Sequence, residues 1–149
     1  MCCQLKLIVI VQMDRLSSEA RSENMAKIRN SDTIPEKIVR KYLYSKGLRY
    51  RKNDKRYPGK PDIVLNKYNT VIFVNGCFWH CHEGCKDFKL PKTNTAFWEK
   101  KLINNAERDK LNYDKLRSDG WNVIIIWECE LRIGVRTECL DKLYNKIIK

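Results

Sequence analysis

The sequence contains only two histidines among its 149 residues. Glycine (six) and proline (four) are also few. Long hydrophobic runs are missing too: the apolar run at residues 5–11 is interrupted by Lys6, is too short to span a membrane and has no convincing cleavage site. We expect residues 1–12 to be an extension upstream of a natural start at Met13, and we base no function on them.

Acidic residues are outnumbered, with 18 Asp and Glu against 30 Lys and Arg, so the formal net charge is +12 and the pI is near 9.5. Such an excess favours nucleic acid or an anionic surface as partner, through long-range attraction and counterion release. A Lys-rich surface that only keeps the protein in solution is the alternative. Residues 21–60 carry thirteen basic and four acidic residues, and this clustering favours nucleic acid.

Seven cysteines, an odd number that clusters with both histidines, indicate metal binding rather than disulfides. The chain is therefore expected in a reducing cytoplasm. Hydrophobic residues are 43% and charged residues 32%, which predicts a globular domain with a core of ordinary size. We assign residues 1–24 to an N-terminal extension and arm, and residues 25–149 to a single domain.

Hydrophobic periodicity and turn signals predict an α/β layer fold. A capping box at residues 33–36 starts a helix that runs to about Lys46, and a long helix capped by Thr95 runs to about Ser118. Further elements are predicted as strands at 48–51, 63–65, 70–74 and 121–127 and as a C-terminal helix at 138–147. The strands at 63–65 and 70–74 should pair as a hairpin that leads into the cysteines and histidines.

The segment after this hairpin holds both histidines and three cysteines within nine residues: Cys77, His80, Cys81, His82 and Cys85. Zinc takes thiolate and imidazole ligands in fours, usually as two pairs distant in sequence, and Cys129 at the end of a strand is the natural distant ligand. Free cysteines buried as small hydrophobic residues are the alternative. Any surplus histidine that the metal holds rigidly is a candidate for proton transfer.

Asp62 opens the first strand of the hairpin, where a carboxylate can ligate magnesium for phosphate chemistry. An ordinary turn aspartate that caps the strand is the alternative. Many metal nucleases pair such an Asp with an acid-x-Lys on the next strand, but residues 72–75 contain neither an acid nor a lysine. Asp87 and Lys89 match the pattern only in a loop, so we discount them, and His80 is the replacement we expect.

Glu36 and three aromatic residues each have a structural and a functional interpretation. Glu36 completes the capping box, and it can also reach a metal-bound water if the helix start points at Asp62. Phe78, Trp79 and Trp98 are each consistent with core residues. Two adjacent aromatics among metal ligands are less easily buried, however, and aromatic wedges between bases are a known device for opening a duplex.

Five segments together resemble the very short patch repair (Vsr) DNA mismatch endonucleases. They are PGKPDIVL (58–65), VIFVNGCFWHCHEGC (71–85), TNTAFWEKKL (93–102), NAERD (105–109) and GWNVIIIWECEL (120–131). The resemblance covers roughly residues 14–132. It implies a restriction-endonuclease-like three-layer fold, with a small mixed central sheet flanked by helices and a structural zinc, that lacks the usual lysine. It also implies an enzyme that nicks duplex DNA 5′ of the thymine in T·G mismatches, which arise when 5-methylcytosine deaminates.

The resemblance also assigns roles by position. For magnesium it implies the carboxylate of Asp62 and the backbone carbonyl of Val74, and for catalysis Asp62, His80 and Glu36. For structural zinc it implies Cys77, His82, Cys85 and Cys129. For contact with DNA it implies Met25, Phe78, Trp79 and Trp98.

Two positions depart from the family pattern: Asn75 stands where many members have histidine, and Cys81 stands at a commonly small or histidine position. The partners implied are T·G-mismatched duplex DNA, mismatch-repair proteins and a cytosine-5 methyltransferase system, with the enzyme a monomer in the bacterial cytoplasm and associated with the nucleoid. Two alternatives stay open: a restriction-type nuclease that cuts matched duplex, and a zinc-stapled DNA-binding protein without activity.

Overall fold

The β-branched segments of the sequence form one mixed sheet. The computed structural model describes residues 17–28 and 31–149, and its strands lie in the spatial order β1 (Arg51–Lys52), β2 (Ile63–Leu65), β3 (Thr70–Asn75) and β4 (Asn122–Trp127). β2 pairs antiparallel with β1 and with β3, which confirms the predicted hairpin, whereas β3 and β4 are parallel. A parallel pair needs a long crossover, and the long helix supplies it.

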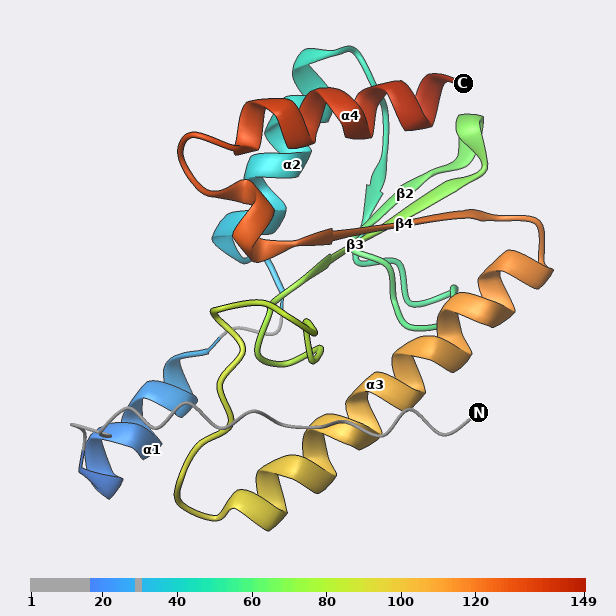
Figure 1. Cartoon of the computed structure of the whole chain (residues 1–149). Helices are drawn as coiled ribbons and strands as arrows, with labels where there is room; N and C mark the ends of the chain where they lie inside the picture. Colours follow the sequence, from blue (N-terminus) through green and yellow to red (C-terminus); the bar gives the residue numbers. More distant parts are fainter. Residues whose placement is uncertain (1–16, 29–30) are drawn as a thin grey trace.

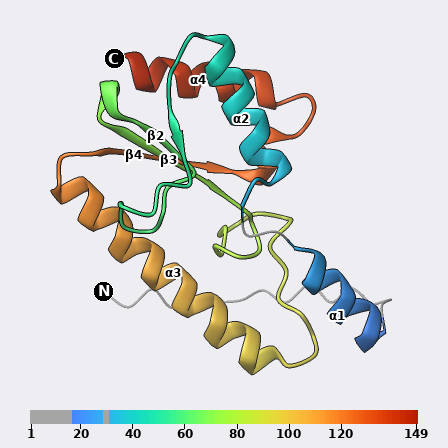
Figure 2. The same cartoon turned by 180° about the vertical axis from the view of Figure 1, so that it is seen from behind.

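Helices cover both faces of this sheet. α2 (Ile34–Ser45) and α4 (Arg136–Ile148) lie together on one face, and the crossover helix α3 (Thr95–Ser118) lies on the other (Figures 1 and 2). α1 (Ser18–Lys27) lies apart from the sheet, beside the loop that leads into α3 (Figure 1). The predicted α/β class is confirmed. Within the described residues, no helix is long and apolar enough to cross a membrane.

Strand alternation divides the hydrophobic core between the two faces. Ile63, Leu65 and Ile72 pack with α2 and α4, whereas their neighbours Val64 and Val71 face α3. This is the period of two that a pleated strand imposes. All five side chains are at most 1% exposed, so the hairpin is the centre of the molecule.

Two element boundaries differ from the sequence-based prediction. The strand expected at 48–51 is reduced to β1, because the Leu48 N–H bonds back to the Leu43 carbonyl and closes the end of α2. Asn94, with φ 52°, caps α3, and Thr95 is its first residue. β4 is an edge strand with alternating exposure, and only Ile124 and Ile126 of its residues are buried.

Candidate active site and metal centre

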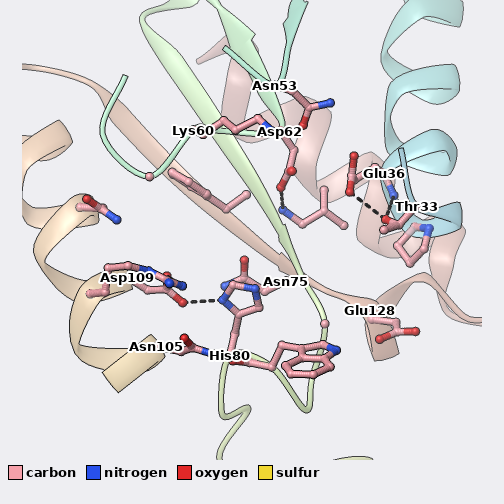
Figure 3. Close-up of a pocket in the computed structure, with 18 of the residues that line it drawn as sticks. Thr33, Glu36, Asn53, Lys60, Asp62, Asn75, His80, Asn105, Asp109 and Glu128 are labelled. Atoms are coloured by element: carbon pink, nitrogen blue, oxygen red, sulfur yellow. Dashed lines mark hydrogen bonds and ion pairs between the residues drawn. The ribbon is translucent and has the colours of Figure 1, made fainter. Parts of the chain in front are cut away.

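A cavity of about 760 Å³ opens where β3 ends, between the start of α2 and one face of α3. Figure 3 shows four of the polar groups that line it: Asp62 and Glu36 lie on one side, and His80 and Asp109 lie on another. Met25 of α1 also lines this cavity. Residues far apart in sequence therefore meet in one cleft, and Asp62 and His80 are among them.

Asp62 directly precedes β2, and the neighbouring strand holds its side chain in place. Its Oδ2 accepts a hydrogen bond from the Val74 N–H at 2.7 Å. Burial raises the pKa of Asp62 to about 6; this hydrogen bond opposes the rise, and the nearby Glu36 carboxylate adds to it. Without a cation, ionising this half-buried carboxylate costs free energy. A metal ion bound to it would stabilise the ionised form.

Glu36 performs the capping role and also reaches the cleft. Its carboxylate accepts hydrogen bonds from the Thr33 hydroxyl and from the Asp32 N–H, both at 2.9 Å. Nη2 of Arg40 lies 3.4 Å from the same carboxylate. Glu36 is only 3% exposed, so these donors keep a buried carboxylate in one orientation. The two interpretations of Glu36 are compatible, because the start of α2 faces Asp62 across the cavity (Figure 3).

His80 is paired with Asp109 of α3, a residue that sequence reasoning did not select. Nδ1 of the imidazole contacts Oδ2 of Asp109 (Figure 3). The aspartate therefore holds the ring with Nδ1 protonated, which leaves Nε2 as the basic nitrogen. Because the His80 side chain is 28% exposed and lines the cleft, this nitrogen is available for proton transfer.

The cleft-facing side of α3 is polar, which explains why Asp109 was missed. Asn105, Asp109, Asn112 and Tyr113 all line the cavity at spacings of four, three and one residues, a single helix face. The Asn105 amide donates to the Trp79 carbonyl at 3.2 Å. Polar residues on a helix normally mark its solvent side, so amphipathic periodicity gave no reason to place them in a site. The one available signal for a polar face toward the site was that Asn105 and Asp109 lie four residues apart.

Four of the clustered residues lie together beside the cleft and could hold a metal ion. Donor atoms of Cys77, His82, Cys85 and Cys129 all lie within 4.8 Å of one another, and the Cys129 sulfur is 3.5 Å from Nδ1 of His82. Burial raises the pKa of both the Cys77 and the Cys129 thiols, so neither would ionise there without a cation. Three thiols and one imidazole in this arrangement fit a soft tetrahedral ion.

Neighbouring groups hold the ligands of this metal site. The Trp127 ring stacks on His82 with 4.0 Å between centroids and 1° between planes. The Asp87 N–H points at the Cys85 sulfur at 3.4 Å, and Arg132 pairs with the Asp87 carboxylate at 2.6 Å. Asp87 therefore belongs to the surroundings of the metal site, in agreement with our exclusion of it as a catalytic acid.

Cys81 is separate from the four ligands. Its sulfur lies 3.3 Å from the Leu102 carbonyl of α3, and its backbone has the left-handed φ of 52°. The chain reverses direction here, so that His80 on one side of Cys81 faces the cleft and His82 on the other faces the metal site. The two histidines thus have different surroundings, as the sequence led us to expect.

The aromatic residues form a partly exposed group rather than a core. Ring centroids of Phe78, Trp79 and Trp98 lie 5.1 to 6.0 Å apart, and all three side chains are half-buried. The Lys101 ammonium lies 5.6 Å from the Trp79 centroid and 5.3 Å from that of Trp98. An apolar surface with a cation above it, adjacent to the cleft, is suited to bases and phosphates.

Comparison with known proteins gives one family. A family model described as DNA mismatch endonuclease Vsr matches residues 13–87. The chain is 49% identical over 135 residues to the type II nicking enzyme V.NmeAIP of Neisseria meningitidis serogroup A, covering 90% of this chain and 96% of that protein. It is 46% identical over 112 residues to the DNA mismatch endonuclease Vsr of Escherichia coli K12, covering 75% and 71%. The type II nicking enzyme V.XorIIP of Xanthomonas oryzae is 45% identical over 118 residues, covering 79% and 86%.

Proposed function

The chain belongs to the Vsr family of DNA mismatch endonucleases, and we propose that its cleft nicks duplex DNA 5′ of the thymine in T·G mismatches. The reaction initiates very short patch repair of deaminated 5-methylcytosine. The observation that carries the chemistry is that Asp62 and the His80–Asp109 pair face one cavity. A nuclease needs both a cation-binding carboxylate and a base near the phosphate, and these groups supply both.

The oxygen donors of the cleft fit a magnesium ion. We propose the Asp62 carboxylate and the Val74 carbonyl as its protein ligands, with Glu36 near its water molecules. The Val74 N–H that bonds Asp62 places the two residues side by side. Magnesium prefers one or two carboxylates and water over an all-protein cage, in agreement with so few ligands. When bound, the ion would lower the pKa of water and neutralise charge on the phosphate.

His80 is the base in this proposal. Its Nε2 takes a proton from the attacking water as the water oxygen bonds to phosphorus, and Asp109 stabilises the imidazolium that results. The bond between phosphorus and the 3′ oxygen breaks, and that oxygen takes up a proton from solvent. The products are a 3′-hydroxyl and a 5′-phosphate. Because His80 is the base, the enzyme needs no other residue in place of the lysine that the acid-x-Lys pattern supplies in many metal nucleases.

We further propose zinc for the four-ligand site and a structural role for it. Cys77 and Cys129 follow the adjacent ends of β3 and β4, so one ion would join these two strands. The segment between the ligands carries His80 and the aromatic group, whose positions the ion would fix. The mixed sheet flanked by helices, with Asp62 at its edge, supports a restriction-endonuclease-like fold for this arrangement.

DNA contacts follow from the aromatic group and from α1. We propose that Phe78, Trp79 and Trp98 insert beside the mismatch and unstack it, and that Met25 approaches the same base pair from α1. The proposed partners are mismatched duplex DNA, mismatch-repair proteins and a cytosine-5 methyltransferase system, with the enzyme acting as a monomer in the bacterial cytoplasm at the nucleoid.

A nicking assay tests this function. Duplexes that differ only in a T·G or matched C·G pair are incubated with magnesium or with EDTA, and the products are mapped on each strand. We expect one nick 5′ of the mismatched thymine with magnesium only. Equal cutting of the matched duplex would favour a restriction-type nuclease. Binding without cutting of any duplex would favour the non-catalytic alternative.

A further inference from the structure

Asn75 and Tyr113 form a polar pair in the cleft for which the reaction above has no role. The Asn75 amide Nδ2 donates to the Tyr113 hydroxyl oxygen at 2.9 Å, which links the end of β3 to α3. Asn75 is 3% exposed and Tyr113 is 9% exposed, yet both line the cavity. Figure 3 shows Asn75 beside His80, on the side of the cavity between His80 and Asp62. The pair therefore lies among the groups proposed for catalysis.

The hydroxyl of Tyr113 has a proton left to donate. Its oxygen already accepts from Asn75, and a phenol can donate one hydrogen bond as well. Among the residues that the structure describes, none accepts that proton. Burial raises the pKa of Tyr113 to about 12, and the Asp109 and Asp62 charges add to this rise, so the hydroxyl stays neutral at every working pH. The cleft thus contains an oriented donor that carries no charge.

The surroundings fix this donor. The Tyr113 ring packs against Phe73 at 4.8 Å between centroids, and Asn75 restrains the oxygen at its tip. A donor held before the substrate arrives costs little reorganisation, which is the property required for stabilising developing charge.

Resting on the proposed nicking activity, we propose that Tyr113 is a further catalytic residue, whose hydroxyl donates a hydrogen bond to a non-bridging oxygen of the scissile phosphate. Asn75 is its positioning residue. No bond to the tyrosine forms or breaks: the proton stays on the phenol while charge on the phosphate oxygen grows. The donor works beside His80, which moves the proton of the attacking water.

The test compares wild type with Tyr113→Phe in single-turnover nicking of T·G duplexes. The scissile group is an ordinary phosphate or either of its two phosphorothioate diastereomers. We expect Tyr113→Phe to nick the phosphate about 10- to 1000-fold more slowly with little change in duplex binding. Sulfur is a weak acceptor, so for one diastereomer the ratio of wild-type to variant rate should fall to about one, and for the other it should persist.

Two further variants separate catalysis from structure. Asn75→Ala should slow nicking, and adding it to Tyr113→Phe should slow the reaction no further, because Asn75 acts through the tyrosine. Tyr42→Phe removes a hydroxyl that bonds Asp141 outside the cleft, and should nick at the wild-type rate. Loss of stability alone cannot produce a ratio that depends on the phosphorothioate diastereomer.

The outcomes distinguish this inference from the proposed function. If wild type does not nick T·G duplex at all, the proposed function fails. If wild type nicks and Tyr113→Phe does so at the same rate, the catalytic role of Tyr113 is wrong. An equal loss on all three substrates would also overturn it, because the hydroxyl would then serve only to hold β3 against α3.

Discussion

At the scale of the residue, the partly buried carboxylate of Asp62 lowers the stability of the folded protein at neutral pH. Its pKa is raised from 3.8 to about 6, mainly by burial, so the ionised form is the one that the fold disfavours. Between these two values the folded state binds more protons than the unfolded state. The contribution of protonated Asp62 to the unfolding free energy is therefore present at low pH and is lost as the pH rises through about 6.

Asp62→Asn should consequently stabilise the metal-free protein at pH 7.5 while abolishing nicking. The expected gain is about 1–3 kcal/mol in unfolding free energy, since one pKa unit corresponds to about 1.4 kcal/mol, and it should vanish near pH 4. Denaturant melts at both pH values measure it. Asp54→Asn is the control of opposite sign, because the Arg56 hydrogen bond lowers the pKa of Asp54 to about 2. If Asp62→Asn were less stable than wild type at pH 7.5, the conclusion that burial destabilises the ionised Asp62 would be wrong.

Asp109 supplies a second prediction at this scale. Asp109→Asn removes the carboxylate that orients His80, so single-turnover nicking should fall by about 10²- to 10³-fold. Binding of T·G duplex should change little. Asp114→Asn alters an exposed carboxylate of the same helix that pairs with Arg117, and should leave the rate unchanged. An unchanged rate in Asp109→Asn would show that His80 needs no partner.

Sequence reasoning could identify the residues whose type is scarce or whose setting is unusual. His80, the cysteines and a carboxylate before a strand stand out because few alternatives exist in the chain. Asp109 is one of 18 acidic residues and lies in a helix rich in charge, so nothing local separates it from a solvated side chain. Its role depends on which side of α3 faces β3, and only the packing of Tyr113 and Leu116 on the sheet decides that.

At the scale of the element, the ends of β3 and β4 explain how a short sequence motif acquires a distant ligand. Asn75 of β3 is in register with Trp127 of β4, so Cys77 and Cys129, each two residues further on, emerge side by side. The parallel pairing was implicit in the two β-branched runs joined by a long helix. The extent of β1 was not predictable from the sequence. It depends on the hydrogen bond from the Leu48 N–H to the Leu43 carbonyl, which keeps the chain at the end of α2.

Removal of one proposed zinc ligand tests the link between these strand ends. Cys129→Ser should lose the zinc, lower the thermal midpoint by more than about 10 °C and abolish nicking, because His80 and the aromatic group lose their support. Metal analysis of the purified protein gives the zinc content. Cys139→Ser, a half-buried cysteine of α4 outside the ligand set, is the matched control and should keep one zinc. Asp62→Asn should also keep it, and a loss there would show that the two metal roles are not separate.

At the scale of the whole molecule, the proposed function gives charge and shape different roles. The net charge of +12 attracts any duplex, whereas the aromatic group can favour only a duplex that is easily unstacked. Affinity should therefore depend steeply on salt, and discrimination between T·G and matched DNA should not. The sequence already separates these two roles, because most of the excess of lysine and arginine lies in a different segment from the short aromatic motif.

Duplex binding measured at increasing salt tests this division of roles. Raising the salt from about 50 to about 200 mM should weaken binding to T·G and matched duplexes alike, by about 10²- to 10⁴-fold, because phosphate contacts release counterions in both complexes. The ratio of the two dissociation constants should change less than about threefold, since apolar insertion releases none. Trp79→Ala should lower that ratio and leave the salt dependence intact, whereas Lys101→Ala should reduce the salt dependence. A ratio that collapsed with salt would mean that charged groups read the mismatch, and the aromatic residues would then serve mainly to hold α3 against the metal-binding segment.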